Sequence, residues 1–373
     1  MTPATGPLAG LVVADFSRVL AGPYATMMLG DMGADVIKIE RPGTGDDTRS
    51  WGPPHDSAGT ATYFNSVNRN KTSRFIDLQS ESGVAEAHEI VAGADIVIEN
   101  FRAGTMDRLG LGYSTLSQSN PGLIYCSISG FGTGGGAALP GYDLVVQAVG
   151  GLMSVTGPDA STPTKVGVAM VDIVTGLHAL SGVLAALHHR TKTGRGQQVH
   201  TSLMASVLSA LSNQSAAYLG AGVVSVPMGN KHPSLVPYEV FETADRPLAL
   251  AVGNDRQFTA LTEVLGTPEL AADERFSSNS LRVENRDRLV DILNTALRTR
   301  TADEWYRELM ARNVPAGPVN SIEEAFAFAD SLGLEPRVQV PGAASDGVRN
   351  PVDFSATPVD YRLPPLPSSS TPT

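Results

Sequence analysis

Asp172 is the carboxylate whose sequence surroundings best suit chemistry. It stands in residues 165–190, KVGVAMVDIVTGLHALSGVLAALHHR, with almost no other charge between Lys165 and His188. A carboxylate kept ionised by a helix N-terminus and delivered into an apolar cleft could act as a nucleophile. The alternative is structural, because an aspartate just before a helix commonly accepts hydrogen bonds from the first free N–H groups. Asp172 by itself does not decide between these roles.

The pattern around Asp172 changes from extended to helical. Residues 166–170 are small and apolar, which indicates extended backbone entering a core. From Ile173 onward, apolar residues recur at helical spacing, which predicts the buried face of a helix. Gly176 and Gly182 are poor helix formers, so they indicate close packing against another backbone. The sequence therefore places Asp172 at a helix start.

Five basic side chains fall in or beside the expected ends of strands. They are Arg41, Lys71, Arg74, Arg102 and Arg108. Solvation is the usual explanation for any one of them. Gathered near one sheet edge of a chain with net charge −11, they would suit a ligand that carries several phosphates. The same net charge argues against nucleic acid or an anionic membrane as a partner.

A glycine-rich loop at residues 130–136, GFGTGGG, fits the dinucleotide pattern G-x-G-x-x-G. A nicotinamide enzyme is therefore an alternative, but residues 139–141 (LPG) break the chain before a helix can open. We interpret the loop as a flexible active-site loop. The histidines make no metal-ligand spacing with one another or with Cys126, so no metal site is expected.

Strand and helix patterns alternate along the first part of the chain. Apolar runs predict strands at 11–16, 36–39, 73–78, 95–99 and 123–129, and helical patterns cover 24–32 and 82–91. Strand, helix and strand within about thirty residues form a βαβ unit, which favours a parallel sheet with helices on its faces. Such sheets bind ligands beyond the carboxyl ends of their strands. The expected fold class is therefore α/β.

The composition shifts after Gly222, so we expect two domains in the 373 residues. Residues 1–222, completed by residues 319–365, would form the large domain. Residues 223–318 would form a smaller α+β domain, with paired strands at 237–241 and 247–252 and helices at 255–265 and 282–299. A second long helix is expected at 202–218 of the large domain. Residues 366–373 are rich in Pro, Ser and Thr and are expected to be disordered.

The composition also suggests a compartment. The single cysteine excludes an internal disulfide and fits a reducing cytoplasm. We expect no membrane span and no signal peptide, because no uninterrupted apolar run is long enough and residues 1–10 lack a basic start. An apolar content of 42% with 17% charged residues is typical of a well-packed globular protein.

Five sequence blocks, in order, resemble the class III CoA-transferase family of the CaiB/BaiF type. They are DFSRVLAGP at 15–23, GADVIKIE at 33–40, ENF at 99–101 with Arg108, GYD at 141–143 and KVGVAMVDIVTG at 165–176. The similarity extends from about residue 8 to residue 365. Residues 228–241 and 252–258 are most similar to the branch that acts on dicarboxylic acids, which includes the succinate–hydroxymethylglutarate CoA-transferase.

The resemblance implies a fold, a reaction and a set of site residues. The fold is a Rossmann-like large domain with a small domain, in a homodimer whose two chains interlink like rings. Asp172 would attack the donor thioester to give a mixed anhydride, and the CoA thiolate would return to form an aspartyl-CoA thioester. The acceptor carboxylate would then run the sequence backwards. The implied contacts for CoA, the substrate, are Leu20, Ala21, Arg41, Ile76, Asp77, Leu78, Asn100, Phe101, Arg108, Tyr142 and Asp143.

The sequence departs from the family pattern in three places. Leu20 replaces a glutamine of formyl-CoA transferase, whose glycine-rich substrate loop is also absent, so formate and oxalate are not the expected substrates. Arg246 and Pro247 stand where relatives have a glycine turn. The usual segment after Pro365 is missing, which affects how the tail would cover the dimer interface.

Two alternatives within the resemblance stay open. One is an α-methylacyl-CoA racemase, whose chemistry needs two bases and which has a histidine where this chain has Tyr142. A tyrosine, with an ordinary pKa of about 10, is a poor base at neutral pH. The other is a non-catalytic CoA-binding protein, against which the intact Asp172 argues. We therefore expect an enzyme that moves CoA from an acyl-CoA to a carboxylic acid, with a dicarboxylate favoured.

Overall fold

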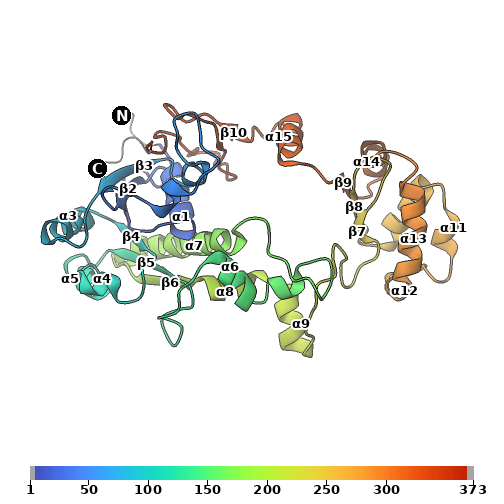
Figure 1. Cartoon of the computed structure of the whole chain (residues 1–373), viewed down its shortest axis with the longest axis horizontal. Helices are drawn as coiled ribbons and strands as arrows, with labels where there is room; N and C mark the ends of the chain where they lie inside the picture. Colours follow the sequence, from blue (N-terminus) through green and yellow to red (C-terminus); the bar gives the residue numbers. More distant parts are fainter. Residues whose placement is uncertain (1–4, 368–373) are drawn as a thin grey trace. The chain divides into compact units, whose positions relative to one another are not determined.

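The computed structural model describes residues 5–367, which divide into two compact units (Figure 1). The first unit contains Met1–Met153, Lys165–Ser225 and Glu335–Thr373, and the second contains Ser154–Thr164 and Val226–Leu334. This division differs from the expected boundaries, because residues 154–164 and 319–334 group with the second unit. The tail expected at 366–373 lies outside the described residues from residue 368 onward.

Six parallel strands form the sheet of the first unit. They are β1 Val12–Asp15, β2 Asp35–Glu40, β3 Lys71–Phe75, β4 Ile96–Glu99, β5 Ile124–Ser129 and β6 Gln198–Ser202. Their order is β3-β2-β1-β4-β5-β6, and every neighbouring pair is parallel, so the α/β prediction is confirmed. Strand β6 was not predicted. The strand order changes direction between β1 and β4, and open α/β sheets bind ligands at such a switch point.

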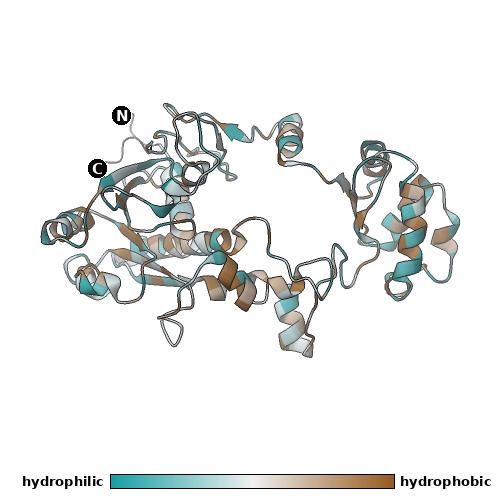
Figure 2. Ribbon diagram, viewed as in Figure 1, coloured by the Kyte–Doolittle hydropathy of each residue, from teal (hydrophilic) through white to brown (hydrophobic). Residues whose placement is uncertain are grey.

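Helices cover both faces of this sheet. Helices α1 (Ala21–Asp31) and α7 (Met170–Thr193) share one core with residues such as Val13 and Ile98. Helices α3 (Glu81–Ala92), α4 (Thr105–Arg108) and α5 (Tyr113–Ser119) cover the other face. Strand β4, central in the sheet, is drawn mainly in brown in Figure 2, which fits its burial on both faces.

The remaining helices of the first unit are short. They are η1 Asp47–Ser50, α2 Thr62–Asn65, α6 Asp143–Val149, α8 Leu203–Ala210 and α9 Asn213–Ala221, and η2 Met153–Val155 lies at the boundary of the two units. The single long helix expected at 202–218 is wrong, because the chain turns between α8 and α9 at Ser212, where φ is 42°. A short antiparallel pair, β10 Arg337–Val338 and β11 Gly347–Val348, follows the return from the second unit.

Helix α7 runs through the core of the first unit. Among the described residues it alone is long and apolar enough to cross a membrane, which was not expected. Its residues Val171, Leu180 and Leu187 are buried in the core, as in the central helix of a globular domain. The prediction for Gly176 is confirmed, because a Cβ there would lie 2.6 Å from the backbone oxygen of Ala21. A Cβ on Gly182 would instead meet a side chain, that of Val199.

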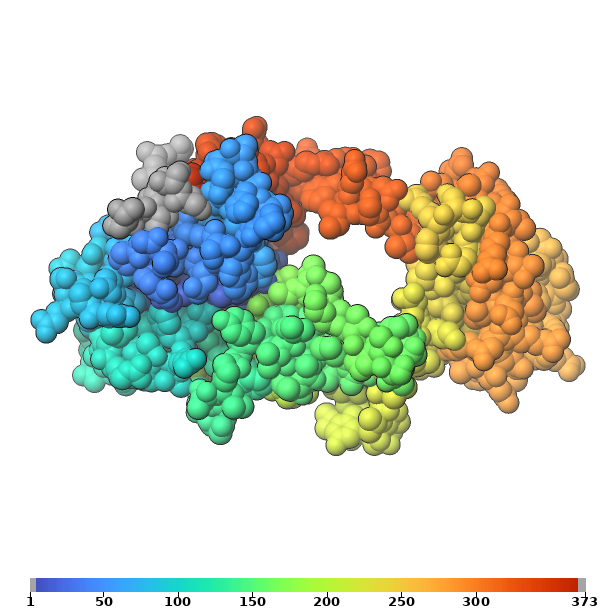
Figure 3. Space-filling model, in the orientation of Figure 1, coloured from blue at the N-terminus to red at the C-terminus, as the bar shows by residue number. Residues whose placement is uncertain are grey.

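The C-terminal segment is fastened to the first unit by side chains that lie far earlier in the chain. The side-chain oxygen of Asn70 accepts the N–H groups of Arg362 and Leu363, at 2.8 and 3.1 Å. Arg49 Nη1 donates to the carbonyl oxygen of Leu366 at 2.8 Å. Figure 3 shows this segment, in red, against the blue N-terminal part of the unit. The described end of the chain is therefore part of the packed structure.

The second unit is α+β, as predicted for this part of the chain. Its antiparallel sheet has the order β7-β8-β9, with β7 Tyr238–Phe241, β8 Leu248–Ala251 and β9 Ala316–Pro318. Its helices are α10 Asp255–Val264, α11 Glu269–Ala272, α12 Asn279–Glu284, α13 Arg286–Leu297, α14 Ala302–Ala311 and α15 Ile322–Ser331. The predicted strand pair is confirmed, but the helix expected at 282–299 is interrupted at Asn285, between α12 and α13.

Candidate active site

A cavity of about 630 Å³ opens at the switch point of the six-stranded sheet. Its walls come from residues 18–21 after β1, residues 99–104 after β4 and the loop that follows β5. Asp172 of α7 completes the wall. Because the strands are parallel, their carboxyl ends meet at one edge and bring these segments together. The cavity therefore lies where the sequence predicted a ligand.

Asp172 lies in the first turn of α7 and not at its cap. The helix begins earlier than expected, at Met170, with Ala169 as the N-cap residue. The cap is supplied by Asp143, whose Oδ1 accepts the N–H groups of Val171 at 2.8 Å and of Asp172 at 3.2 Å. The capping role considered for Asp172 is thus taken by another carboxylate, and the Asp172 side chain lines the cavity.

Asp143 is itself held in place by a buried amide. Gln147, which is fully buried, donates from Nε2 to Asp143 Oδ2 at 2.5 Å. The Oε1 of the same side chain accepts the N–H of Val166 at 2.9 Å. Helix α6 therefore fixes the segment that leads into α7. Asp143, one of the implied contacts for CoA, does not line the cavity and instead fastens the helix start that carries Asp172.

The ionisation of Asp172 differs from the expectation that the helix N-terminus keeps it charged. Burial raises the pKa of its carboxyl group to about 7, and the nearby carboxylate of Asp143 adds to the rise. The N–H groups of Val171 and Asp172 are already occupied by Asp143. Near neutral pH the side chain is thus poised between its two protonation states. A perturbed carboxyl group in a cavity is typical of a functional site.

Tyr63, an aromatic residue near Asp172, and Trp51, which packs against it, were not predicted. Burial raises the pKa of Tyr63 to about 12, and the carboxylates of Asp172, Asp143 and Asp46 contribute. The hydroxyl group therefore stays protonated at neutral pH and can donate a hydrogen bond. The ring of Trp51 packs edge-on against that of Tyr63, with centroids 5.2 Å apart. Both lie in a loop-rich segment without a motif, where only their aromatic character could have drawn attention.

About half of the residues predicted to contact CoA line the cavity. Those that line it are Leu20, Ala21, Asn100, Phe101 and Tyr142. Those that do not are Arg41, Ile76, Asp77, Leu78, Arg108 and Asp143. Arg41 and Arg108 are exposed, and their guanidinium groups donate to the hydroxyls of Thr44 and Thr105 at 3.5 and 3.3 Å. A path for CoA that reaches these arginines stays a prediction.

Comparison with known proteins decides the family. Residues 8–371 match CoA-transferase family III. The chain belongs to this family. It is 43% identical to the succinate–glutarate CoA-transferase of Agrobacterium fabrum, over 96% of this chain and 92% of that protein. It is 39% identical to the acetyl-CoA:oxalate CoA-transferase of Acetobacter aceti, over 98% and 94%.

A solved structure agrees with this assignment. The crystal structure of a CAIB/BAIF family protein from Brucella suis superposes with a TM-score of 0.88 at 42% identity. The match covers 97% of this chain and 96% of that one. The family inferred from five short blocks is therefore confirmed, and so is the fold class that it implied.

Within this family III chain, the five basic residues singled out in the sequence have different roles. Lys71 is buried and forms an ion pair with Asp15 at 3.2 Å, so it belongs to the core. Arg74 pairs with Glu86 at 2.7 Å on the surface. Arg102 lines the cavity and is exposed. Only part of the predicted basic set thus faces the ligand site.

Arg18 is a basic residue of the cavity wall that the sequence analysis did not assign to the site. Its guanidinium group lies over the ring of Phe101, 4.9 Å from the centroid. Burial lowers the pKa of Arg18, and the positive charge of Arg41 lowers it further. Two cations therefore lie near each other, Arg18 in the cavity wall and Arg41 outside it, an arrangement that suits an anionic ligand. The signal was its place directly after a strand end, in the DFSRVLAGP block.

Proposed function

We propose that this family III chain transfers CoA from an acyl-CoA thioester to a dicarboxylic acid through a covalent thioester on Asp172. The observation that carries the proposal is the Asp172 carboxylate itself. It is half-buried, lines the cavity at the sheet switch point and has a pKa raised to about 7. A carboxylate nucleophile of this kind keeps the energy of the thioester in a covalent bond.

The reaction balances without water or a net proton. The ionised Asp172 attacks the thioester carbonyl, the carbon–sulfur bond breaks, and its electrons leave with the CoA thiolate. The thiolate then attacks the Asp172 carbonyl of the mixed anhydride and releases the donor carboxylate. The acceptor carboxylate attacks the aspartyl thioester, and the thiolate returns to the new anhydride and frees Asp172. Water would hydrolyse the two anhydrides and the thioester, so the partly apolar wall around Asp172 protects them.

The acceptor is proposed to be a dicarboxylate because the relatives and the cavity agree. The Agrobacterium relative is named for succinate and glutarate, and Arg18 and Arg102 supply cations to the cavity wall. Leu20 in place of a glutamine argues against oxalate, yet the Acetobacter relative is named for oxalate. Oxalate therefore belongs with succinate and glutarate among the acceptors to be compared.

The proposal includes the CoA contacts, a homodimer and a location. CoA is proposed to follow Leu20, Ala21, Asn100 and Phe101, with its phosphates toward Arg41 and Arg108. An interlinked homodimer is supported by apolar side chains that are exposed to solvent in a single chain, such as Leu219 at 82% and Val224 at 77% exposure. A cytoplasmic location is supported by the single, buried cysteine.

Trapping the covalent intermediate tests the proposed function. The protein is incubated with succinyl-CoA and then with hydroxylamine, which converts an aspartyl thioester to a hydroxamate. Mass spectrometry should place the hydroxamate on Asp172, and Asp172→Asn should abolish transfer to glutarate. Asp291→Asn, which changes an exposed aspartate of the second unit, is the matched control and should transfer at the wild-type rate. An unmodified Asp172 together with an active Asp172→Asn variant would rule the mechanism out.

A further inference from the structure

The turn between β1 and α1 holds a strained residue. Val19 has a φ of 68°, in the left-handed region that β-branched side chains strongly disfavour. It stands in the cavity wall, between Arg18 and Leu20. Such a conformation persists only where surrounding contacts over-determine it, and it is often found at functional sites.

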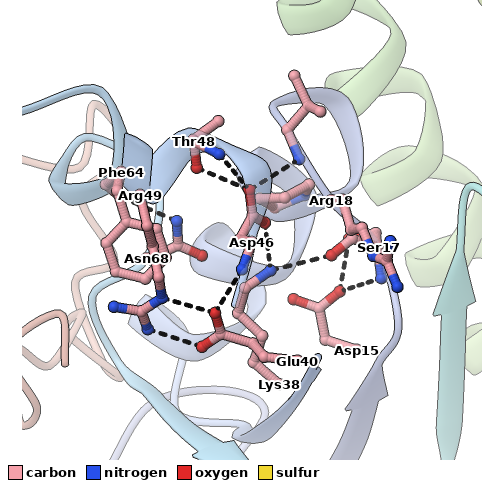
Figure 4. Close-up of polar contacts among 12 residues, drawn as sticks. Asp15, Ser17, Arg18, Lys38, Glu40, Asp46, Thr48, Arg49, Phe64 and Asn68 are labelled. Atoms are coloured by element: carbon pink, nitrogen blue, oxygen red, sulfur yellow. Dashed lines mark hydrogen bonds and ion pairs between the residues drawn. The ribbon is translucent and has the colours of Figure 1, made fainter. Parts of the chain in front are cut away.

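A buried ion pair holds one side of this turn (Figure 4). Lys38 Nζ donates to the carbonyl oxygen of Ser17 at 2.9 Å and pairs with Asp46 Oδ2 at 2.9 Å. Asp46 Oδ1 in turn accepts the N–H of Val19 at 3.4 Å. Asp46 is fixed by its own N–H, which donates to Glu40 Oε2 at 2.8 Å. The side chains of Lys38 and Asp46 are almost fully buried, so this support is rigid.

A neutral side chain holds the middle of the turn. Asn100, directly after β4, accepts the N–H of Arg18 on Oδ1 at 2.9 Å. The Nδ2 of Asn100 donates to the carbonyl oxygen of Arg18 at 2.8 Å. The peptide groups on both sides of Arg18 are thus fixed from the neighbouring strand. Because Asn100 is uncharged, its removal leaves no buried charge without a partner.

The turn packs against the part of α7 that carries the proposed nucleophile. Val19 and Leu20 belong to one apolar cluster with Ala169 and Ile173, which flank Asp172. One turn further along α7, the absence of a side chain at Gly176 lets the helix approach the Ala21 carbonyl. A shift of the Val19 turn would therefore move the wall beside Asp172.

We propose that Val19 is a positioning residue, whose strained turn sets the cavity wall beside Asp172. Contacts from Lys38, Asp46 and Asn100 stabilise the strained backbone conformation. The inference rests on the proposed function, because its effect is read in the rate of CoA transfer. If a holding contact is lost, the valine relaxes and the wall moves. Glycine at position 19 accepts the left-handed conformation without strain, so the turn should then keep its place with fewer contacts.

A rescue experiment tests this relation. Asn100→Ala removes the contacts to Arg18, and its kcat for transfer from succinyl-CoA to glutarate should fall roughly 10- to 100-fold, as expected for a small misplacement. Adding Val19→Gly to Asn100→Ala should raise kcat again by roughly tenfold. Glycine adopts the left-handed conformation without strain, so the turn keeps its position without the contacts from Asn100. Adding Val19→Ala is the matched control, since it removes the same methyl groups but still disfavours the left-handed form. It should restore little.

The readouts separate positioning from binding of CoA. The dissociation constant of free CoA is measured by calorimetry for each variant, because Asn100 also lines the cavity. If Asn100 acts only by touching CoA, Val19→Gly cannot restore kcat. Equal recovery with glycine and alanine, or no recovery with glycine, overturns the proposal.

Thermal unfolding tests the strain independently of activity. Val19→Gly should unfold about 2–4 °C above Val19→Ala, because both lose the two Cγ methyl groups and glycine, which lacks only the Cβ in addition, relieves the backbone. Equal midpoints would refute the strain. An unmodified Asp172 together with an active Asp172→Asn variant refutes the proposed function, and the unfolding comparison still tests the strain in the turn. A wild-type protein that transfers CoA, with no rescue by glycine, refutes the positioning role alone.

Discussion

The raised pKa of Asp172 predicts how CoA transfer depends on pH. A carboxyl group with a pKa of about 7 is about 9% ionised at pH 6 and about 91% ionised at pH 8. Only the carboxylate attacks a thioester, and kcat/KM reports the ionisation of the free enzyme. The kcat/KM for succinyl-CoA should therefore rise about tenfold between pH 6 and pH 8 and then level off.

Asp143→Asn makes this prediction sharper. The change removes the second cause of the raised pKa, the like charge, and leaves the first cause, burial, in place. The midpoint of the profile should move to lower pH but stay above 3.8, the ordinary value for this side chain. The amide oxygen of the new asparagine can still accept the two N–H groups at the start of α7, so the cap is kept. The amide nitrogen cannot accept the bond that Gln147 Nε2 donates to Asp143 Oδ2, so that one bond is lost.

The assay is the initial rate of glutaryl-CoA formation at a series of pH values, in buffers of constant ionic strength. A melting curve for Asp143→Asn should show one cooperative transition about 2–4 °C below the wild type, since the bond from Gln147 is lost while the helix start is kept. A profile that is flat from pH 5.5 to 8, or a midpoint that rises in Asp143→Asn, would refute the assignment of the titration to Asp172.

The other predictions concern stability, CoA binding and the racemase alternative. Since a raised pKa means that the folded state disfavours the charged form, the stability lost through Asp172 grows as pH rises from about 4 to 7. Asp172→Asn should thus raise the melting temperature more at pH 8 than at pH 4, and equal shifts would contradict this. Arg41→Ala and Arg108→Ala should each weaken CoA binding by roughly tenfold, for every acyl-CoA alike, as measured by calorimetry; unchanged affinity in both removes them from the CoA path. In deuterated water, a single enantiomer of a 2-methylacyl-CoA should take up no deuterium at its α-carbon without an acceptor, because Asp172 attacks the carbonyl; Asp172-dependent exchange seen by mass spectrometry would favour a racemase.

The sequence by itself determined the class of fold and the family. Apolar runs at 11–16, 36–39 and 95–99, separated by helical patterns, predicted parallel strands. Strands buried on both faces are continuously apolar, and the crossover helices between them repeat at helical spacing. Gly176 likewise predicted a close approach of two backbones, because glycine is a poor helix former and inside a helix usually has a packing or functional reason. Asp172 was singled out because a lone carboxylate in an apolar stretch is costly without a purpose.

Helix boundaries were predicted less well than helices. Helix α7 starts at Met170 because Asp143 caps it from another helix, and no residue next to Asp172 in the sequence signals this. The expected single helix at 202–218 is two helices, since the chain turns at Ser212. The start of α7 is set by one tertiary contact and the break at Ser212 by one backbone angle. Neither feature produces a periodic pattern in the sequence.

Only the tertiary structure decided the state of the candidate site. The pKa of Asp172 depends on how much water its neighbours exclude and on the charge of Asp143, and both are properties of the assembled fold. The five basic residues looked alike in the sequence, yet Lys71 is buried against Asp15 while Arg102 faces the cavity. Val19 looked like an ordinary valine, and its left-handed backbone follows from contacts made by residues as distant in the sequence as Asn100. A pattern in the sequence records which residues prefer to be buried, but charge, strain and ionisation at a site are set by groups that the chain brings together only when it folds.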